Sequence, residues 1–197
     1  MSLTCRYISG LGRARRWTFS AVSGASGIVG QIAVQSAPLL GAGRVVAAAR
    51  SEESLKRARR ELGADAAVRI DEDGDLGDRF RGAAGGDVDL VIDPVWGPAA
   101  VAALEALGEG GRLVQIGNSA GAETEVPARA IRTRIRSIIG HTNFAAPHAV
   151  KEGAFQSMCH HAAGGSRYGR GSPTRSGRRG LGRQADGPHR KLVIRPE

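Results

Sequence analysis

The sequence predicts an α/β fold in which helices cover both faces of a doubly wound parallel sheet. Two observations lead to this prediction. Short apolar runs alternate with segments of helical periodicity, and a glycine-rich turn separates the first run from the first helix. At 197 residues the chain is long enough for one well-formed core. We therefore expect a single domain with irregular N- and C-terminal ends.

The first helix and the second strand follow the glycine turn. Apolar residues recur at helical spacing from Ile28 to Leu40. Pro38 predicts that this helix ends or bends nearby, because a proline inside a helix removes a hydrogen bond. Residues 44–49 form a short apolar run of the kind found in buried parallel strands.

The later elements continue the alternation of helix and strand. We expect a charged helix at 52–62 ending at Gly63, a strand at 66–70, a loop with about one helical turn at 71–87, a strand at 88–93, a helix at 98–107 capped by Gly108, and a strand at 112–117 after a turn at 110–111. Residues 131–140 alternate Arg or Thr with Ile, which is compatible with one more strand.

The glycine turn at residues 22–30, Val-Ser-Gly-Ala-Ser-Gly-Ile-Val-Gly, has the chemistry of a phosphate site. Gly24 and Gly27 let the backbone turn and approach a phosphate without an intervening Cβ, and Gly30 lets the helix pack close to the strand. The free N–H groups and partial positive charge of a helix N-terminus suit a dinucleotide pyrophosphate. Ala25 replaces the first glycine of a strict G-x-G-x-x-G, so the motif depends on its context.

That context comes about twenty residues later, at the end of the second predicted strand. Arg50 and Ser51 stand where an NAD-binding protein usually has a carboxylate on the ribose hydroxyls, and Lys56 follows on the next helix. A guanidinium and a hydroxyl can bind a 2′-phosphate, which a carboxylate would repel. Arg50 alone would be interpreted as a solvated loop residue, but at this distance from a glycine turn it indicates NADP(H) rather than NAD.

Further candidate positions fall at the ends of predicted strands. Ligands bind parallel α/β sheets at the carboxyl ends of the strands. Four segments of this chain are expected there: 24–30, Arg50, 94–97 and 117–118.

Six segments resemble the medium-chain dehydrogenase/reductase family, especially its quinone oxidoreductase and zinc-binding-dehydrogenase-like branch. They are G-A-S-G-I-V-G-Q-I-A-V-Q at 24–35, R-R-E-L-G-A-D at 59–65, D-L-V-I-D-P-V-W-G at 89–97, G-G-R-L-V-Q-I-G-N-S-A-G at 110–121, G-H-T-N-F at 140–144 and H-R-K-L-V-I-R-P at 189–196. The resemblance implies a Rossmann fold that carries NADP(H). It also implies pyrophosphate contacts from Ser26, Gly27, Ile28 and Val29, 2′-phosphate contacts from Arg50 and Ser51, and nicotinamide contacts from Gly117, Asn118, Asn143 and Phe144.

The family usually has a separate catalytic domain before the nucleotide fold, whereas only twenty residues precede Ala21 here. We therefore expect the nucleotide-binding part alone. The expected division is an irregular basic segment at 1–20, an NADP(H)-binding Rossmann domain at 21–163, a disordered Arg/Gly-rich segment at 164–182 and a family-like strand at 183–197.

The net charge of +9 belongs to the two ends of the chain. Residues 1–20 carry +4 and residues 164–197 carry +7, which leaves −2 for residues 21–163. Three interpretations of 164–182 stay open: an interruption of the family sequence such as a compensated frameshift, a plain linker, and an Arg-rich nucleic-acid contact in which Tyr168 stacks on a base. Family-like sequence resumes after this segment, which favours the interruption, and we do not expect nucleic acid as a partner.

No pattern indicates a general acid, a general base or a nucleophile, so we assign no catalytic residue. Cys5 and Cys159 are far apart without C-x-x-C spacing, and the two histidines after Cys159 point in different directions on a helix, so no metal site is expected. The sequence has no apolar run of bilayer length and no secretory signal, which predicts a cytoplasmic protein without membrane contact. The segment 131–140 offers a sheet edge for a homodimer.

The sequence thus predicts an NADP(H)-dependent oxidoreductase of the quinone/enone or alcohol type, or its truncated cofactor-binding half. In such chemistry the cofactor supplies the hydride and the protein binds and orients it. Two alternatives stay open: a catalytically inactive nucleotide-binding remnant, and a protein that binds nucleic acid through its Arg-rich ends.

Overall fold

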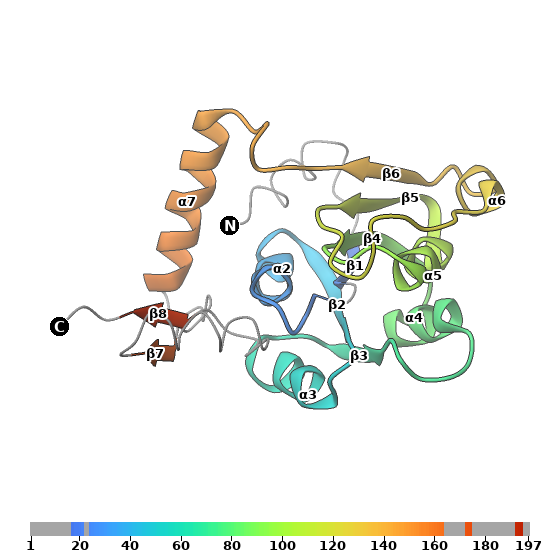
Figure 1. The fold of residues 1–197 in the computed structure, drawn as a ribbon, viewed down its shortest axis with the longest axis horizontal. Coiled ribbons are helices and arrows are strands. Elements are labelled where there is room, and N and C mark those ends of the chain that lie inside the picture. The colour runs from blue at the N-terminus through green and yellow to red at the C-terminus, as the bar shows by residue number, and fades with distance from the viewer. Residues whose placement is uncertain (1–16, 22–23, 164–171, 175–191, 195–197) are drawn as a thin grey trace.

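The computed structural model describes residues 17–21, 24–163, 172–174 and 192–194, whose arrangement Figure 1 shows. Six parallel strands form one sheet in the order β3-β2-β1-β4-β5-β6. Their bounds are β1 Trp17–Ala21, β2 Ala42–Ala49, β3 Ala66–Arg69, β4 Val88–Asp93, β5 Leu107–Gln115 and β6 Ser137–Gly140. This order is that of a Rossmann fold, which confirms the doubly wound parallel sheet expected from the sequence.

Six helices belong to the described chain. They are α2 Ile28–Leu39, α3 Glu52–Glu61, α4 Leu76–Ala84, α5 Pro98–Ala106, α6 Ala128–Arg132 and α7 His148–Ala163. Figure 1 shows α7 to one side of the sheet, after the loop that follows β6. Two short parallel strands, β7 Ser172–Thr174 and β8 Leu192–Ile194, pair with each other.

Two of these elements bear on the expected division of the chain. The central strand β1 begins at Trp17, four residues before the predicted start of the Rossmann domain at 21. Of the segment 164–182, only strand β7 lies within the described residues. The division into four segments stays a prediction.

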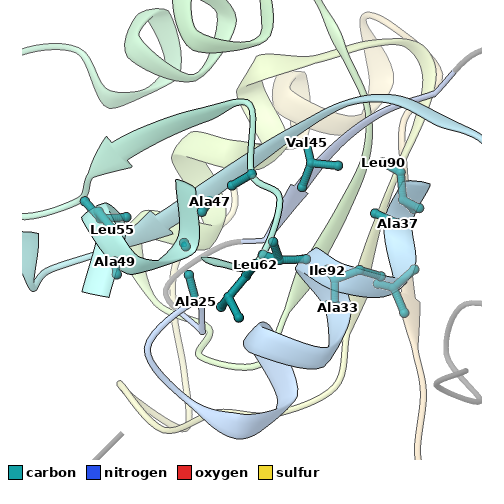
Figure 2. Packing of buried hydrophobic residues seen from close by; sticks show 14 residues of the cluster. Ala25, Ala33, Ala37, Val45, Ala47, Ala49, Leu55, Leu62, Leu90 and Ile92 are labelled. Atoms are coloured by element: carbon teal, nitrogen blue, oxygen red, sulfur yellow. The ribbon is translucent and has the colours of Figure 1, made fainter. Parts of the chain in front are cut away.

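The sheet separates two apolar cores, and the side chains of β2 alternate between them. Val45, Ala47 and Ala49 pack in the core that also contains buried residues of α2 and α3, which Figure 2 shows. Val46 and Ala48 pack on the opposite face with buried residues of α4 and α5. Alanine supplies about half of the buried apolar residues in the described chain. The helices therefore cover both faces, as a doubly wound sheet requires.

The ends of the first two helices agree with the sequence signals. Helix α2 ends at Leu39, directly after Pro38, so the expected end near the proline is confirmed. Helix α3 begins after Ser51, whose side chain caps it, and its backbone leaves the helix at Gly63 with a φ of +86°. A glycine suits this position because a left-handed φ strains residues that carry a Cβ.

The acidic stretch 71–87 contains more helix than expected. Instead of about one turn in a loop, it forms α4, nine residues long. Asp75 caps this helix by accepting a hydrogen bond from the Asp78 N–H at 2.9 Å, and Gly85 ends it in the left-handed conformation. The expectation of a loop was wrong because it weighed the glycine content of the segment above the helix start signal at Asp75 and the helix stop signal at Gly85.

The segment 108–111, expected as a helix cap followed by a turn, lies inside β5. This strand begins at Leu107, directly after α5. Val88 of β4 pairs with Leu107, but Leu90 pairs with Arg112, so β5 carries extra residues between these two pairings. The glycines therefore form a bulge within the strand.

The segment 131–140 does contain a further strand, as its pattern allowed, but only its last four residues form it. The segment begins within α6, passes through Ile135 at a φ of +54°, and becomes a strand only over Ser137–Gly140. Arg136, next to this turn, is buried, and its side chain donates to three backbone carbonyl oxygens. These bonds fix the start of β6 against α5 and α6.

Candidate functional site

The predicted site segments meet at one edge of the sheet. Because the strands are parallel, the loops that follow β1, β2, β4 and β5 all leave from their carboxyl ends. The chain order reverses between β1 and β4, which are neighbours in the sheet although β2 and β3 come between them in sequence. In open α/β sheets the crevice at such a reversal is the ligand site.

The turn between β1 and α2 is built around a close backbone approach. The Gly27 N–H donates to the Gly24 carbonyl at 2.9 Å, and the Gln31 N–H donates to the Gly27 carbonyl at 2.9 Å. A Cβ on Gly30 would lie only 1.6 Å from the Gly24 carbonyl oxygen. Gly30 is therefore required by the packing of the helix against the turn, as the sequence predicts.

Gly27 differs from Gly30, because the protein itself leaves room for a side chain there. Its φ of −85° and ψ of 164° are extended values open to any residue. A Cβ on Gly27 would lie 3.6 Å from the Gly24 carbonyl oxygen, an ordinary van der Waals contact. The N-cap residue of α2 is Gly27, which has no side chain to cap the first-turn N–H groups of the helix. The space and the donors together fit an anion such as a pyrophosphate.

A buried glutamine holds this turn in shape. Gln31 is 2% exposed, and its Nε2 donates to the Ser26 carbonyl at 2.9 Å. This bond ties the middle of the turn to the first part of α2. Sequence analysis missed this residue. The available signal was a polar residue on the apolar face of the helix, which needs a partner when it is buried.

The three residues expected near a 2′-phosphate follow the carboxyl end of β2. Arg50 is exposed. The Ser51 Oγ accepts from the Ser54 N–H at 3.2 Å, so it already caps α3. The Lys56 Nζ lies 2.6 Å from the Glu52 Oε1, one helical turn away. Ser51 and Lys56 therefore have partners at the start of α3, whereas Arg50 is exposed and directly follows β2.

The loops after β4 and β5 are held close together. The buried Asp93 carboxylate accepts from the N–H groups of Val95 and Trp96 at 3.0 Å each, and burial raises the pKa of Asp93 against these two hydrogen bonds. Trp96 has a φ of +66°, a conformation that these bonds help to hold. A Cβ on Gly117 would lie 2.5 Å from the Pro94 carbonyl oxygen. Asp93 thus holds the loop after β4 in shape, and the close approach of Gly117 to Pro94 holds the loop after β5 against it.

The remaining predicted residues lie beyond these loops. Asn118 and Asn143 are exposed, and their carbonyl groups accept from the N–H groups of Gly121 at 3.1 Å and Ala146 at 3.4 Å. Phe144 is 96% exposed, so its ring is not packed in this structure. Asn143 and Phe144 follow β6, two strands away from β4 in the sheet. Their contact with a nicotinamide stays a prediction.

Two further properties concern only the described residues. No three His, Cys, Asp or Glu side chains there come together in a way that could hold a metal ion. Within the same part of the chain, no helix has the length and apolar character needed to cross a bilayer.

Known proteins match this chain in sequence as well as in fold. The family profile described as zinc-binding dehydrogenase matches residues 29–158. The acryloyl-coenzyme A reductase of Sulfurisphaera tokodaii is 40% identical over 115 residues, which cover 57% of this chain and 31% of that protein. The quinone oxidoreductase of Thermus thermophilus, solved also with NADPH, superposes with a TM-score of 0.75 at 28% identity, over 98% of this chain and 63% of that one.

A further comparison concerns the fold alone. An alcohol dehydrogenase zinc-binding domain protein from Burkholderia ambifaria superposes with a TM-score of 0.81 at 22% identity, over 99% of this chain and 53% of that one. The chain thus spans less than two thirds of the length of each of these relatives. The family profile nevertheless covers most of this chain, including most of α2 and the strand ends that follow it. This chain therefore belongs to the zinc-binding dehydrogenase family, within the medium-chain dehydrogenases and reductases.

Proposed function

We propose that this chain binds NADP(H) and is the cofactor-binding half of an oxidoreductase that acts on quinones or enones. The observation that carries the proposal is the contrast between two glycines: Gly30 is required by the protein's own packing, while Gly27 leaves a Cβ-sized space beside uncapped helix N–H groups. A space of this kind, at a strand end beside the sheet's reversal point, fits a pyrophosphate.

The comparisons support the cofactor and the reaction class. The Thermus quinone oxidoreductase binds NADPH, and the Sulfurisphaera relative reduces an acryloyl thioester, a conjugated carbonyl compound. NADPH, when bound, would supply a hydride. The part of the relatives that this chain does not span would then select the substrate.

The predicted residues of the glycine turn and of the ends of β2 and β5 have binding roles in this proposal. Ser26, Gly27, Ile28 and Val29 present backbone at the pyrophosphate, and Arg50 presents a guanidinium to the 2′-phosphate. Gly117 and Asn118 border the nicotinamide side, where the loop capped by Asp93 limits the width of the crevice. None of these residues transfers a proton, so this half binds and orients the cofactor without acid or base chemistry.

Replacing Gly27 by alanine tests the proposal. The variant folds, at a cost of about 1 kcal/mol or less, because its Cβ meets no closer neighbour than the Gly24 carbonyl. The same methyl group stands where a phosphate oxygen would approach, so NADPH affinity falls about tenfold or more. Binding is followed by the fluorescence of NADPH titrated into the full chain.

Gly82→Ala in α4 is the matched control. A Cβ on Gly82 meets nothing within 4 Å, and α4 packs on the other face of the sheet from α2. This variant keeps wild-type affinity. Equal affinities for Gly27→Ala and wild type would contradict the pyrophosphate site. Cofactor binding without reduction of any quinone or enone would instead favour the inactive remnant.

We also infer that β6 pairs with a second copy of the chain. It is the last strand of the described sheet, so its outer edge has backbone groups that no other strand of this sheet pairs with. Light scattering on the purified chain would then give a dimeric mass, and a monomeric mass at all concentrations would contradict this inference.

A further inference from the structure

We propose that Asp71 and Arg69 together determine how strongly this site prefers a phosphorylated over an unphosphorylated ribose. The inference rests on the proposed function and concerns the adenosine end of the same cofactor. In it, the Asp71 carboxylate occupies cationic groups that a 2′-phosphate would otherwise bind.

Asp71 and Arg69 lie at the end of the strand that neighbours the one before Arg50. Strands β2 and β3 are paired in parallel, with Ala49 opposite Arg69, and the Ile70 N–H donates to the Ala49 carbonyl at 3.2 Å. The carboxyl end of β3 therefore runs directly alongside the carboxyl end of β2. Arg50 directly follows the end of β2, and Asp71 lies two residues after the end of β3.

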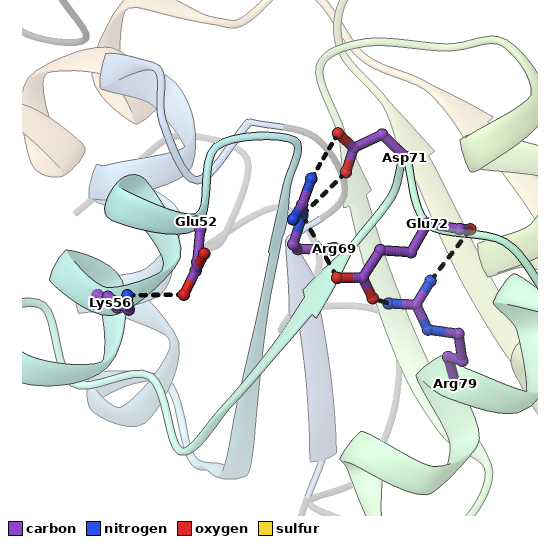
Figure 3. Close-up of polar contacts among 6 residues, drawn as sticks. All are labelled: Glu52, Lys56, Arg69, Asp71, Glu72 and Arg79. Carbon is purple, nitrogen blue, oxygen red and sulfur yellow. Dashed lines mark hydrogen bonds and ion pairs between the residues drawn. The ribbon is translucent and has the colours of Figure 1, made fainter.

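Asp71 and Arg69 are in direct contact. The Arg69 Nε donates to the Asp71 Oδ1 at 3.1 Å, and the Arg69 Nη2 donates to the Asp71 Oδ2 at 2.9 Å, as Figure 3 shows. The planar guanidinium thus forms a bidentate hydrogen bond with the two carboxylate oxygens. A phosphate offers the same paired acceptors, so the two anions compete for one fork of donors.

Arg50 also acts on the Asp71 carboxylate, through its charge. The pKa of Asp71 is held below its usual value, mainly by the hydrogen bond from Arg69, and the charge of Arg50 also contributes. Arg50 makes no ion pair within the described part of the chain. Asp71 therefore lies in the field of two guanidinium groups, of which only one is bound to it.

The Arg69 side chain is partly exposed, and it forms ion pairs with two carboxylates, Asp71 and Glu72. Glu72 lies between Arg69, at 3.5 Å, and Arg79, to which it is also paired. Arg69 and Lys56 line one open cavity of about 650 Å³, together with Glu52 and Glu72. The cavity brings cations of α3 and β3 close to the Arg69 guanidinium, but neither Arg50 nor Asp71 lines it.

These contacts predict opposite effects on the two cofactors. Asp71 repels a 2′-phosphate and keeps Arg69 engaged, whereas a ribose hydroxyl can donate to such a carboxylate. Asp71→Asn therefore strengthens NADPH binding by about three- to tenfold, as expected for one partly screened charge, and leaves NADH binding unchanged or weaker. Arg69→Gln has the reverse effect on NADPH, because it leaves the Asp71 charge unpaired.

The experiment measures dissociation constants for NADPH and NADH by fluorescence, with the full chain at low and high salt. Asp73→Asn is the matched control, because it removes the same charge from the same exposed loop. The inference expects a change in the NADPH-to-NADH ratio for Asp71→Asn that exceeds the change for Asp73→Asn and shrinks at high salt.

Three results would contradict it, and they are distinguishable. Equal shifts for Asp71→Asn and Asp73→Asn would show that only overall charge matters. Unchanged ratios in Asp71→Asn and Arg69→Gln, with NADPH bound by the wild type, would overturn this inference and leave the proposed function intact. No binding of either cofactor by the wild type or Asp71→Asn would overturn both.

Discussion

Replacing Arg136 by methionine tests whether one buried guanidinium holds β6 in the sheet. The Arg136 Nε donates to the Leu107 carbonyl at 2.7 Å, Nη1 to the Ala130 carbonyl at 2.8 Å and Nη2 to the Glu105 carbonyl at 2.9 Å. Methionine keeps an unbranched stem of similar reach and removes all three donors. The change therefore separates the hydrogen bonds from the packing of the stem.

The expected cost follows from what each acceptor keeps. The Glu105 carbonyl still accepts from Arg81 Nη1 at 3.0 Å, so two of the three carbonyls, those of Leu107 and Ala130, lose the side-chain donor without such a replacement. Each loss costs about 1–3 kcal/mol in a buried setting. Part of this cost is recovered, because burial lowers the pKa of Arg136 and so disfavours its charge, an effect to which Arg134 adds. We expect a net loss of about 2–4 kcal/mol in the free energy of unfolding.

Urea unfolding followed by circular dichroism measures this loss, since urea does not screen charges. Arg134→Met is the matched control, because Arg134 lies two residues away and has one half-exposed ion pair, at 2.7 Å from Asp87. That variant is expected to lose about 1 kcal/mol or less. Losses for the two variants that agree within about 0.5 kcal/mol would refute the role given to the Arg136 hydrogen bonds.

Two more predictions concern strain and pH. Ile135→Asn raises the melting temperature by about 2–4 °C, because asparagine tolerates the φ of +54° and the isoleucine is 71% exposed; an unchanged or lower value would contradict this. Asp93 has a raised pKa in the folded state, so its contribution to stability is largest at acidic pH and declines as pH rises from the unfolded pKa through the folded one. Asp93→Asn removes this titration and keeps an oxygen acceptor, so its stability relative to wild type rises over the pH range above the pKa of an unfolded aspartate, about 4. A difference that is constant or falls over this range in urea titrations would exclude a raised pKa.

Much of the fold could be predicted because local signals agree with the tertiary structure. The strand at 88–93 is an apolar run closed by a proline, and the structure gives the same bounds. The extent of the strand in segment 131–140 could not be predicted, because the alternation of Arg or Thr with Ile suits a strand along the whole segment. In the structure its first half joins a helix, and a left-handed turn at Ile135 separates this helix from β6. That turn is imposed by tertiary contacts such as those of Arg136, which no local pattern contains.

The candidate site divides in a similar way. The glycine turn follows from sequence spacing, because Gly30 has a steric reason that any such turn shares. The partners of Ser51 and Lys56 depend on side-chain conformations within α3. The contact of Arg69 with Asp71 is local, but its position beside Arg50 requires β2 and β3 to be neighbours. The sequence predicts parallel strands without stating which pairs are adjacent, so this cluster emerged only from the structure.

The abundance of alanine in the two cores makes the tolerance of this fold to substitution one-sided. An alanine side chain has a single methyl group to lose, so truncation at these positions removes little buried surface. Enlargement has the opposite consequence, because the buried alanines of α5 and β2 are surrounded by packed apolar side chains that a larger group would have to displace. Substitutions that enlarge a side chain between the sheet and the helices are therefore tolerated less well than substitutions that shorten one.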